Sequence, residues 1–546
     1  MPQWNKFALT SGPAVYARQY LLKPEIIYGE PEKEEIIFYK DGLSANVAVS
    51  QSPKGYLAMR VNGKVDASAG KIEFKEIGDL DTMLLTGYLP LLLHPKQPEN
   101  ALIVGLGSGI TLGAMTQYPL DEIDLVEIEP AIIEGAKHFK EFNHDALNDS
   151  RVKTIIEDGR NLLLISPKKY DIISSQPSNP WVKGNANLFT KEYYQLSKNH
   201  LKEKGLMLQW VQLYSLEKED LKSVIYTFSE VFPYTQVWSS TNYKDLFLIG
   251  SLEPIRIDKE KFSARFNLPG IKEDFKKAAI SEPEEIFSLF IFDQEQIKKF
   301  SKAKLHIDDF PFLEFNTPRA IYKDTVSQNL EELYSFKESF EELYRIEIPK
   351  EIKDFQEKSL LATIAREKGD SEGAIKFYEK ALEIKSHPIL EGKLAEYYFG
   401  KGKLAALEEK KEEALSFYQK AVELNPTEPV FLNSFGSAYF KENNFEKAEF
   451  YFKKAIEVGP YYSWAFSNLG LIYLRQEKYD LAEKYLKKAL KINEKNTDAL
   501  NWLAIIYHNR GQDEKAKEML EKSLKINPDQ PKTKERMEEL KKILNQ

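Results

Sequence analysis

The sequence predicts a doubly wound α/β sheet, preceded by a small antiparallel β-sheet and followed by an all-α repeat array. Strand-like and helix-like segments alternate between about residues 76 and 251, which is typical of a parallel sheet with helices on both faces. A 34-residue period runs through the C-terminal third. At 546 residues the chain is too long for one hydrophobic core. We therefore expect four parts: a β-rich segment (1–75), the α/β domain (76–251), a helical linker region (252–354) and the repeat array (355–546).

The composition narrows the possible functions. A net charge of −8 does not indicate the excess of basic residues that binds a polyanion, so we expect no nucleic-acid partner. The absence of cysteine excludes disulfides, thiolate zinc sites and cysteine nucleophiles, and the scattered histidines predict no metal site. The longest apolar run, Met83 to Leu93, is too short for a bilayer, and the N-terminus shows no signal pattern. We expect a cytoplasmic protein without a membrane span.

Residues 35–72 predict the small antiparallel sheet. Apolar and polar residues alternate there around turn signals, of which Asn62-Gly63 is the clearest. Both residues tolerate positive φ, which a tight hairpin turn requires.

The α/β domain contains seven strand candidates. The last two are separated only by Ser239 to Lys244, which is too short for a crossover helix, so we expect an antiparallel hairpin. Amphipathic stretches at 131–142 and 190–201 are predicted helices. The strand candidates are 101–105, 123–127, 152–156, 170–175, 205–211, 233–239 and 245–250.

Residues 252–354 are charged and mostly helical in pattern. Within them, residues 305–315 combine aromatic residues with the carboxylates Asp308, Asp309 and Glu314. We interpret this segment as a structural loop that packs back on the sheet. The alternative is that its carboxylates reach a functional site.

The C-terminal third repeats a pattern of small residues. Gly436, Gly470 and Ala504 share one position of the 34-residue period, and an insertion of six residues is expected near Leu404 to Glu409. Small residues at fixed positions let antiparallel helices approach closely. The pattern resembles the tetratricopeptide repeat, an α-solenoid, and implies a protein or peptide partner. About five units cover roughly 355–530; their paired small residues are Ala374/Ala381, Ala414/Ala421, Ala448/Ala455, Ala482/Ala489 and Ala516/Ser523.

Four short motifs follow successive strands of the α/β domain. Gly105, Gly107 and Gly109 form a glycine loop whose backbone could approach a ligand closely. Glu127 ends the second strand, where a carboxylate can accept both hydroxyl groups of a ribose. Asp158 ends the third strand and suits an exocyclic amine such as adenine N6. Two successive carboxylates would repel a pyrophosphate but suit an adenosyl group that carries a sulfonium.

These motifs resemble the spermidine synthase (polyamine aminopropyltransferase) family, a branch of the class I methyltransferase-like (Rossmann-like) fold. The resemblance covers residues 35–250, and the string from Pro177 to Thr190 is most similar to long bacterial members. It implies that decarboxylated S-adenosylmethionine, or S-adenosylmethionine itself, binds at Gly105, Gly107, Ser108, Gly109, Glu127, Asp158 and Gly159.

The family's reaction is displacement at the carbon next to sulfur by a primary amine. The amine arrives protonated, with a reference pKa of about 10, so a carboxylate must hold it and remove a proton. Three positions that are acidic in the family are here Ser108, Gln176 and Asn179. We take Gln176 and Asn179 as the residues at the catalytic positions; the candidates for substrate contact are Asp66, Trp181 and Gln209.

Three hypotheses for the function remain open. The first is aminopropyl transfer to a small amine, with acidic groups supplied by Asp66 or by the 305–315 segment. The second is methyl transfer from S-adenosylmethionine, in keeping with Ser108 and with neutral amides at the acceptor side. The third is a catalytically weak nucleoside-binding module on a repeat scaffold.

Overall fold

A computed structural model of the chain describes residues 10, 12, 34–182, 184–300 and 303–544. Within these residues the chain divides into two compact units. The first runs from Glu35 to Leu390 and the second from Glu391 onward. Among the described residues, no helix is long and apolar enough to cross a membrane.

The small N-terminal sheet has the predicted antiparallel form. Its four strands are hydrogen-bonded in sequence order, and Asn62 and Gly63 make the last turn with φ values of 50° and 81°. Positive φ at both turn positions is what a two-residue hairpin needs. The strands are β1 (Glu35–Asp41), β2 (Asn46–Gln51), β3 (Leu57–Val61) and β4 (Lys64–Ala69).

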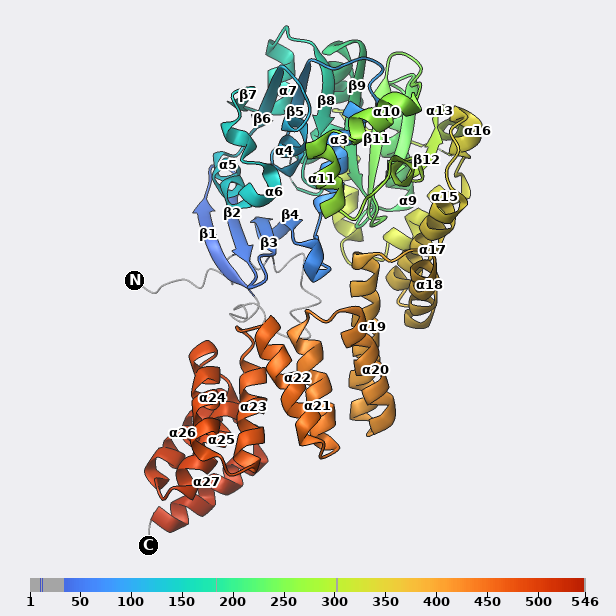
Figure 1. The fold of residues 1–546 in the computed structure, drawn as a ribbon. Coiled ribbons are helices and arrows are strands. Elements are labelled where there is room, and N and C mark those ends of the chain that lie inside the picture. Colours follow the sequence, from blue (N-terminus) through green and yellow to red (C-terminus); the bar gives the residue numbers. More distant parts are fainter. Residues whose placement is uncertain (1–9, 11, 13–33, 183, 301–302, 545–546) are drawn as a thin grey trace. The chain divides into compact units, whose positions relative to one another are not determined.

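The main sheet has eight strands in the order β12-β10-β11-β9-β8-β5-β6-β7 (Figure 1). The five strands from β9 to β7 pair in parallel, and β10 with β11 forms the predicted antiparallel hairpin. All seven predicted strands are present. Their bounds are β5 (Asn100–Val104), β6 (Glu122–Glu127), β7 (Val152–Ile156), β8 (Tyr170–Ser175), β9 (Leu201–Gln212), β10 (Tyr234–Ser239) and β11 (Asp245–Ser251).

The eighth strand, β12 (Phe290–Asp293), comes from the region expected to be a helical linker. It pairs antiparallel with β10 and buries Phe290, Ile291 and Phe292. Four residues without flanking turn signals give no recognisable strand pattern. The helices of this region are α10 (Lys259–Phe266), α11 (Pro269–Lys277), α12 (Pro283–Phe287), α13 (Gln294–Phe300), α14 (Phe312–Asn316), α15 (Val326–Ser335) and α16 (Phe340–Tyr344).

Helices cover both faces of the sheet, and alternate residues of β5 point to opposite cores. Ile103 belongs to one hydrophobic cluster, with α3, α4, α10 and α11, while Leu102 and Val104 belong to the other, with α7, α8 and α9. The bounds not yet given are α3 (Leu80–Leu93), α4 (Ile110–Thr116), α5 (Pro130–Ala136), α6 (Lys140–Asn143), α7 (Gly159–Ile165), α8 (Lys191–Asn199) and α9 (Lys218–Ser229).

Helix α3 lies entirely in the core, and its C-terminal end is closed by one side chain. All fourteen of its residues are buried. The guanidinium of Arg265, on α10, donates hydrogen bonds to the carbonyls of Leu91, Leu92, His94 and Lys96. Carbonyls in the last turn of a helix have no partner within the helix, so Arg265 satisfies groups that burial would otherwise leave unpaired.

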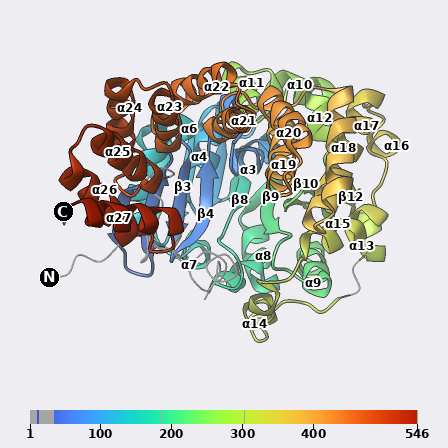
Figure 2. The same ribbon diagram turned by 90° about the horizontal axis from the view of Figure 1, so that it is seen from below.

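Successive repeat helices pack against one another in pairs, as the sequence predicts (Figure 2). A Cβ on Gly436 would come within 2.8 Å of Phe452, and one on Gly470 within 2.7 Å of Leu486, so a larger residue at either position would displace the neighbouring side chain. The helices are α17 (Lys350–Glu367), α18 (Ser371–Ile384), α19 (Pro388–Leu407), α20 (Lys411–Leu424), α21 (Pro429–Lys441), α22 (Phe445–Val458), α23 (Ser463–Arg475), α24 (Tyr479–Ile492), α25 (Thr497–Asn509), α26 (Asp513–Ile526) and α27 (Pro531–Leu544).

The insertion expected near residues 404–409 lengthens a helix and forms no loop of its own. Helix α19 has 20 residues, whereas α21, α23 and α25 have 13 each. Its last turn exposes Leu404 and Leu407.

We predict that Arg265→Met destabilises the chain by at least about 2 kcal/mol, because buried carbonyls at the end of α3 lose their donor. Urea denaturation of the full chain measures the loss. Arg256→Met, at an exposed position of the same region, is the matched control and should leave the unfolding midpoint unchanged. Equal midpoints for the two variants would contradict this role of Arg265.

Candidate functional site

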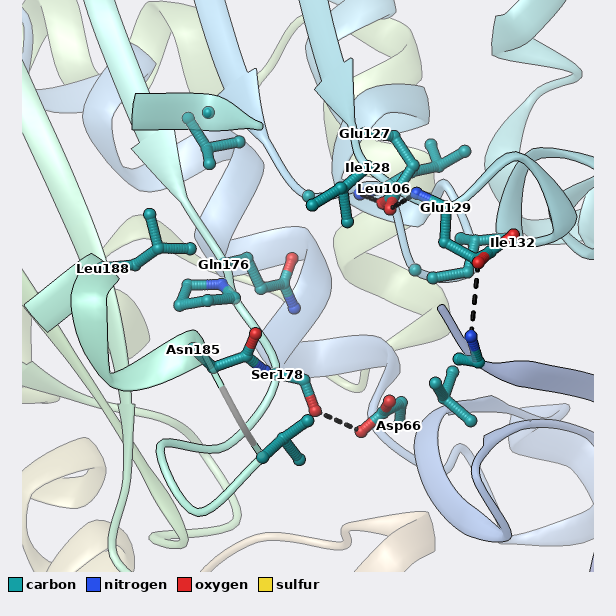
Figure 3. Close-up of a pocket in the computed structure, with 18 of the residues that line it drawn as sticks. Asp66, Leu106, Glu127, Ile128, Glu129, Ile132, Gln176, Ser178, Asn185 and Leu188 are labelled. Atoms are coloured by element: carbon teal, nitrogen blue, oxygen red, sulfur yellow. Dashed lines mark hydrogen bonds between the residues drawn. The ribbon is translucent and has the colours of Figure 1, made fainter. Parts of the chain in front are cut away.

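A cavity of about 370 Å³ opens at the carboxyl ends of β5, β6, β7 and β8 (Figure 3). Its other wall is supplied by β3, β4 and the turn between them. Strand order reverses between β5 and β8, since β6 and β7 lie on one side and β9 on the other. In open α/β sheets, ligands bind at such a switch point.

The glycine loop after β5 permits close approach of two backbone segments. Gly105, Gly107 and Gly109 have φ values of +91°, +53° and +80°. A Cβ on Gly105 would lie 2.8 Å from the carbonyl oxygen of Gln176, which follows β8. Gly105 and Gly107 line the cavity. Gly109, expected to do so, instead precedes α4 outside the lining.

Glu127 lines the cavity and holds the glycine loop in place. Its carboxylate accepts one hydrogen bond from the amide of Leu106 and one from the amide of Glu129, each at 2.9 Å. Burial raises the pKa of Glu127, and the two amides oppose that rise. Each carboxylate oxygen keeps a second lone pair, so the group can still accept from a ligand.

Glu129, to which the sequence alone assigned no role, joins the small sheet to the main one. Its carboxylate accepts from the amide and hydroxyl of Ser44 at 2.7 and 2.9 Å, and from the amide of Ala131 at 3.0 Å. Burial opposes ionisation, but these donors outweigh it and lower the pKa of Glu129. The wall that β3 and β4 supply is therefore fixed to the end of β6.

Asp158 and Gly159 form the third side of the cavity. Asp158 caps α7 by accepting from the amides of Arg160 and Asn161 at 2.8 and 3.1 Å. A Cβ on Gly159 would lie 2.7 Å from Val104, so a side chain there would push α7 away from β5. Both residues line the cavity, as does Arg160.

The 305–315 segment packs on α7, α8 and α9, the helices that cover one face of the sheet. Asp308 makes a two-pronged ion pair with Arg160, at 2.8 and 2.5 Å, and the backbone of His306 bonds with Lys191 and Thr227. Neither Asp308 nor Asp309 nor Glu314 lines the cavity. The segment therefore contacts the cavity wall through Arg160 and, by the bond between the His306 ring and the Ala186 carbonyl, through the 185–189 turn.

The side of the cavity around Ser108 and the loop after β8 carries amides and a buried hydroxyl. Gln176 accepts from the hydroxyl of Thr111 at 2.6 Å, and Ser108 donates to the sulfur of Met83 at 3.0 Å. Asn179 is fully buried, and its side-chain nitrogen donates to the Tyr214 hydroxyl at 3.3 Å; its side-chain oxygen has no partner among the described residues. An amide accepts hydrogen bonds but does not take up a proton near neutral pH.

Asp66 is the carboxylate that faces this side. It accepts from Lys64 at 2.7 Å and from the hydroxyl of Ser178 at 2.8 Å (Figure 3). Ser178 lies between Gln176 and Asn179, so Asp66 ties β4 to the acceptor loop. Only 13% of the Asp66 side chain is exposed.

Two of the expected substrate residues do not line the cavity. Gln209 is fully buried on the opposite face of β9, and Trp181 packs edge-on against Tyr214, 6.2 Å between ring centroids. Trp210 and Tyr214 line the cavity in their place. Period-2 alternation along β9 was the available signal, because it puts Trp210 on the face opposite Gln209.

A group of carboxyls lies behind Trp210. Asp245 accepts from the Trp210 indole at 3.2 Å and from the Thr82 hydroxyl at 3.0 Å, and Asp79 accepts from Ser68 at 2.6 Å. Burial, with the neighbouring charge of Asp79, raises the pKa of Asp245 to about 7. The sequence patterns did not indicate this group.

Comparison with known proteins identifies the family. A family model described as the spermine/spermidine synthase domain matches residues 83–242. A polyamine aminopropyltransferase of Korarchaeum cryptofilum is 30% identical over 244 residues, which cover 43% of this chain and 72% of that protein. The chain belongs to the spermine/spermidine synthase family. Polyamine aminopropyltransferase 2 of Aquifex aeolicus is 26% identical, over 46% of this chain and 50% of that protein.

A spermine/spermidine synthase unit is thus combined with repeats in one chain. Tetratricopeptide repeat models match residues 359–388, 395–428, 433–492 and 473–534, as the sequence predicts. Among solved structures, the spermidine synthase from Thermotoga maritima is 22% identical, with a TM-score of 0.38, over 48% of this chain and 86% of that chain.

We predict that Asp245→Asn raises the melting temperature at pH 8 more than at pH 5.5. The folded state binds the Asp245 proton more tightly than the unfolded state, so its contribution to stability is lost as pH rises from about 4 to about 7. The difference is at most about 4 kcal/mol. Asp121→Asn, at an exposed position, is the control. A pH-independent shift would contradict the burial of a titrating carboxyl.

Proposed function

We propose that the chain is an aminopropyltransferase that binds decarboxylated S-adenosylmethionine in this cavity and transfers its aminopropyl group to a primary amine. The net negative charge of the residues that line the cavity is the main support for this proposal. Among the described residues that line it, two are basic, Lys64 and Arg160, and each is already paired, with Asp66 and Asp308. Five carboxylates line it: Asp66, Glu127, Glu129, Glu157 and Asp158.

This excess of negative charge favours ligands that are purely cationic. Decarboxylated S-adenosylmethionine carries a sulfonium and an ammonium, and an amine acceptor carries one or more ammonium groups. Ordinary S-adenosylmethionine adds a carboxylate, for which the described lining residues offer no unpaired cation. Methyl transfer is therefore the less supported alternative.

The nucleoside half of the proposed ligand fits the three loops after β5, β6 and β7. Glu127 would accept from the ribose hydroxyls and Asp158 from the adenine amine. The glycine loop would lie under the sulfonium side chain. Glycine at positions 105 and 159 keeps the loops close together, because any side chain there would meet a neighbouring strand or loop.

On the acceptor side, Asp66 supplies the proton-accepting carboxylate that Gln176 and Asn179, as amides, cannot supply. Its carboxylate holds the incoming ammonium and accepts a proton from it. The amine nitrogen then attacks the carbon next to sulfur, the C–N bond forms, and the electrons of the breaking C–S bond stay on sulfur. The products are methylthioadenosine and an aminopropylated amine. On this proposal the tetratricopeptide repeats bind a protein or peptide partner.

The test is product analysis by mass spectrometry on the full chain with decarboxylated S-adenosylmethionine and 1,4-diaminobutane. We expect methylthioadenosine and the aminopropylated diamine in equal amounts. Asp66→Asn should lower kcat by about 10²-fold, as for loss of a general base. Asp309→Asn, exposed and outside the cavity, should leave kcat unchanged. No product from decarboxylated S-adenosylmethionine, or a methylated amine when S-adenosylmethionine replaces it, would contradict the proposal.

A second prediction tests the proposed contact between Asp158 and the nucleoside part of the ligand separately from the transfer reaction. Asp158→Asn should weaken methylthioadenosine binding by about tenfold, equivalent to one hydrogen bond to a charged group. Asparagine also caps helices, so α7 keeps its N-terminal hydrogen bonds. Isothermal titration of the variant and of Asp121→Asn measures the difference. Unchanged affinity in Asp158→Asn would remove Asp158 from the ligand contacts.

A further inference from the structure

Asp308 belongs to a segment that lies outside the part of the chain matched by the spermine/spermidine synthase model, which covers residues 83–242. The segment is nevertheless fixed to the helices beside the cavity. The backbone amide of Asp308 donates to Glu192 on α8 at 3.0 Å. The amide of His306 donates to the Thr227 hydroxyl on α9 at 2.9 Å. The position of the Asp308 side chain is therefore set by its own backbone contacts as well as by its ion pair.

The ring of His306 joins the segment to a turn that forms part of the cavity wall. The ring is fully buried, and its Nε2 lies 3.0 Å from the carbonyl oxygen of Ala186. Because a carbonyl only accepts hydrogen bonds, we assign the ring proton to Nε2. Burial lowers the pKa of His306 to about 4, so the ring is neutral near neutral pH. Asn185, Asn187 and Leu188 of the same turn line the cavity (Figure 3).

Arg160 donates to three residues that this arrangement brings together. Its guanidinium bonds to both carboxylate oxygens of Asp308, at 2.8 and 2.5 Å. It also donates to the carbonyl of Asn187 at 3.1 Å and to the hydroxyl of Thr190 at 3.4 Å. A two-pronged pair with a carboxylate fixes the plane of a guanidinium as well as its distance. The Arg160 side chain is therefore held on the side of the 185–189 turn.

This pairing leaves one oxygen of Asp158 available. The two amides that Asp158 caps, those of Arg160 and Asn161, both donate to Oδ1. Among the described residues, no hydrogen bond or ion pair ends on Oδ2. Arg160 follows Asp158 by two residues, and the charge of Asp158 acts on its guanidinium. Without Asp308, the guanidinium would be drawn to Oδ2, because an opposite charge this close is the strongest acceptor that remains to it.

We propose that Asp308 is a positioning residue for the nucleoside: by holding Arg160, it keeps Oδ2 of Asp158 free to accept from the exocyclic amine of adenine. It thereby sets the preference for adenine over a purine that carries an oxygen at the same place, since that oxygen has no N–H to donate to the carboxylate. The identity of the ligand rests on the proposed function. Base selectivity thus depends on a segment beyond the region that the family model matches.

The test is isothermal titration of the full chain with methylthioadenosine and with methylthioinosine, in which an oxygen replaces the exocyclic amine. The parent chain should prefer methylthioadenosine by at least about tenfold. Asp308→Asn releases Arg160 to Asp158, so this ratio of affinities should fall at least about fivefold. Asp308→Glu keeps the carboxylate and should keep the ratio. Asp309→Asn, at the adjacent exposed position outside the cavity, is the matched control and should also keep it.

A double variant distinguishes this role from a purely structural one. In Arg160→Gln/Asp308→Asn no guanidinium remains to pair with Asp158, so the preference for methylthioadenosine should return. If Asp308 only fastened the segment, its loss would weaken both nucleosides by the same factor, and the second substitution would restore nothing. Recovery in the double variant is a coupling between the two positions that single substitutions cannot show.

The outcomes separate this inference from the proposed function. A parent preference that is unchanged in Asp308→Asn, or that is lost there and not recovered in the double variant, overturns the positioning role and leaves aminopropyl transfer standing. Equal affinity of the parent chain for the two nucleosides removes Asp158 from the ligand contacts and overturns this inference with it. Binding of neither nucleoside overturns both the proposed function and the positioning role.

Discussion

The paired carboxylates at the end of β6 are the interaction on which the rest of the site depends. Glu127 accepts from the amides of the glycine loop and of its own turn, and Glu129 accepts from Ser44. These contacts join β5, β6 and the small sheet around one cavity. Since both carboxylates are occupied by backbone donors, the site is organised before any ligand binds.

The distribution of charge explains why amides can stand at Gln176 and Asn179. Carboxylates line the cavity on several sides, among them Asp66 on β4 and Asp158 before α7. A cationic acceptor needs nearby negative charge, but that charge can come from any wall of a small cavity. The family's acidic loop is thus one arrangement among several that electrostatics allows.

Local patterns predicted most of the fold and several of the residues that line the cavity after β5, β6 and β7. Positive φ at Gly105 and the strand-end position of Glu127 follow from residues near in sequence. Strand β12 was missed because four residues are too few to show the alternation of polar and apolar residues that marks a strand. Trp210 was missed because tertiary packing decides which face of β9 lines the cavity, and Tyr214 lies beyond the end of that strand. The bond between Thr82 and Asp245 joins residues 163 apart, which no local pattern encodes.

The central claim is that the cavity selects a purely cationic cofactor. Isothermal titration of the full chain with decarboxylated S-adenosylmethionine and with S-adenosylmethionine, at equal ionic strength, tests it most directly. Repulsion between the added carboxylate and the acidic lining predicts that the decarboxylated form binds at least about tenfold more tightly. Equal affinities, or tighter binding of S-adenosylmethionine, would contradict the account.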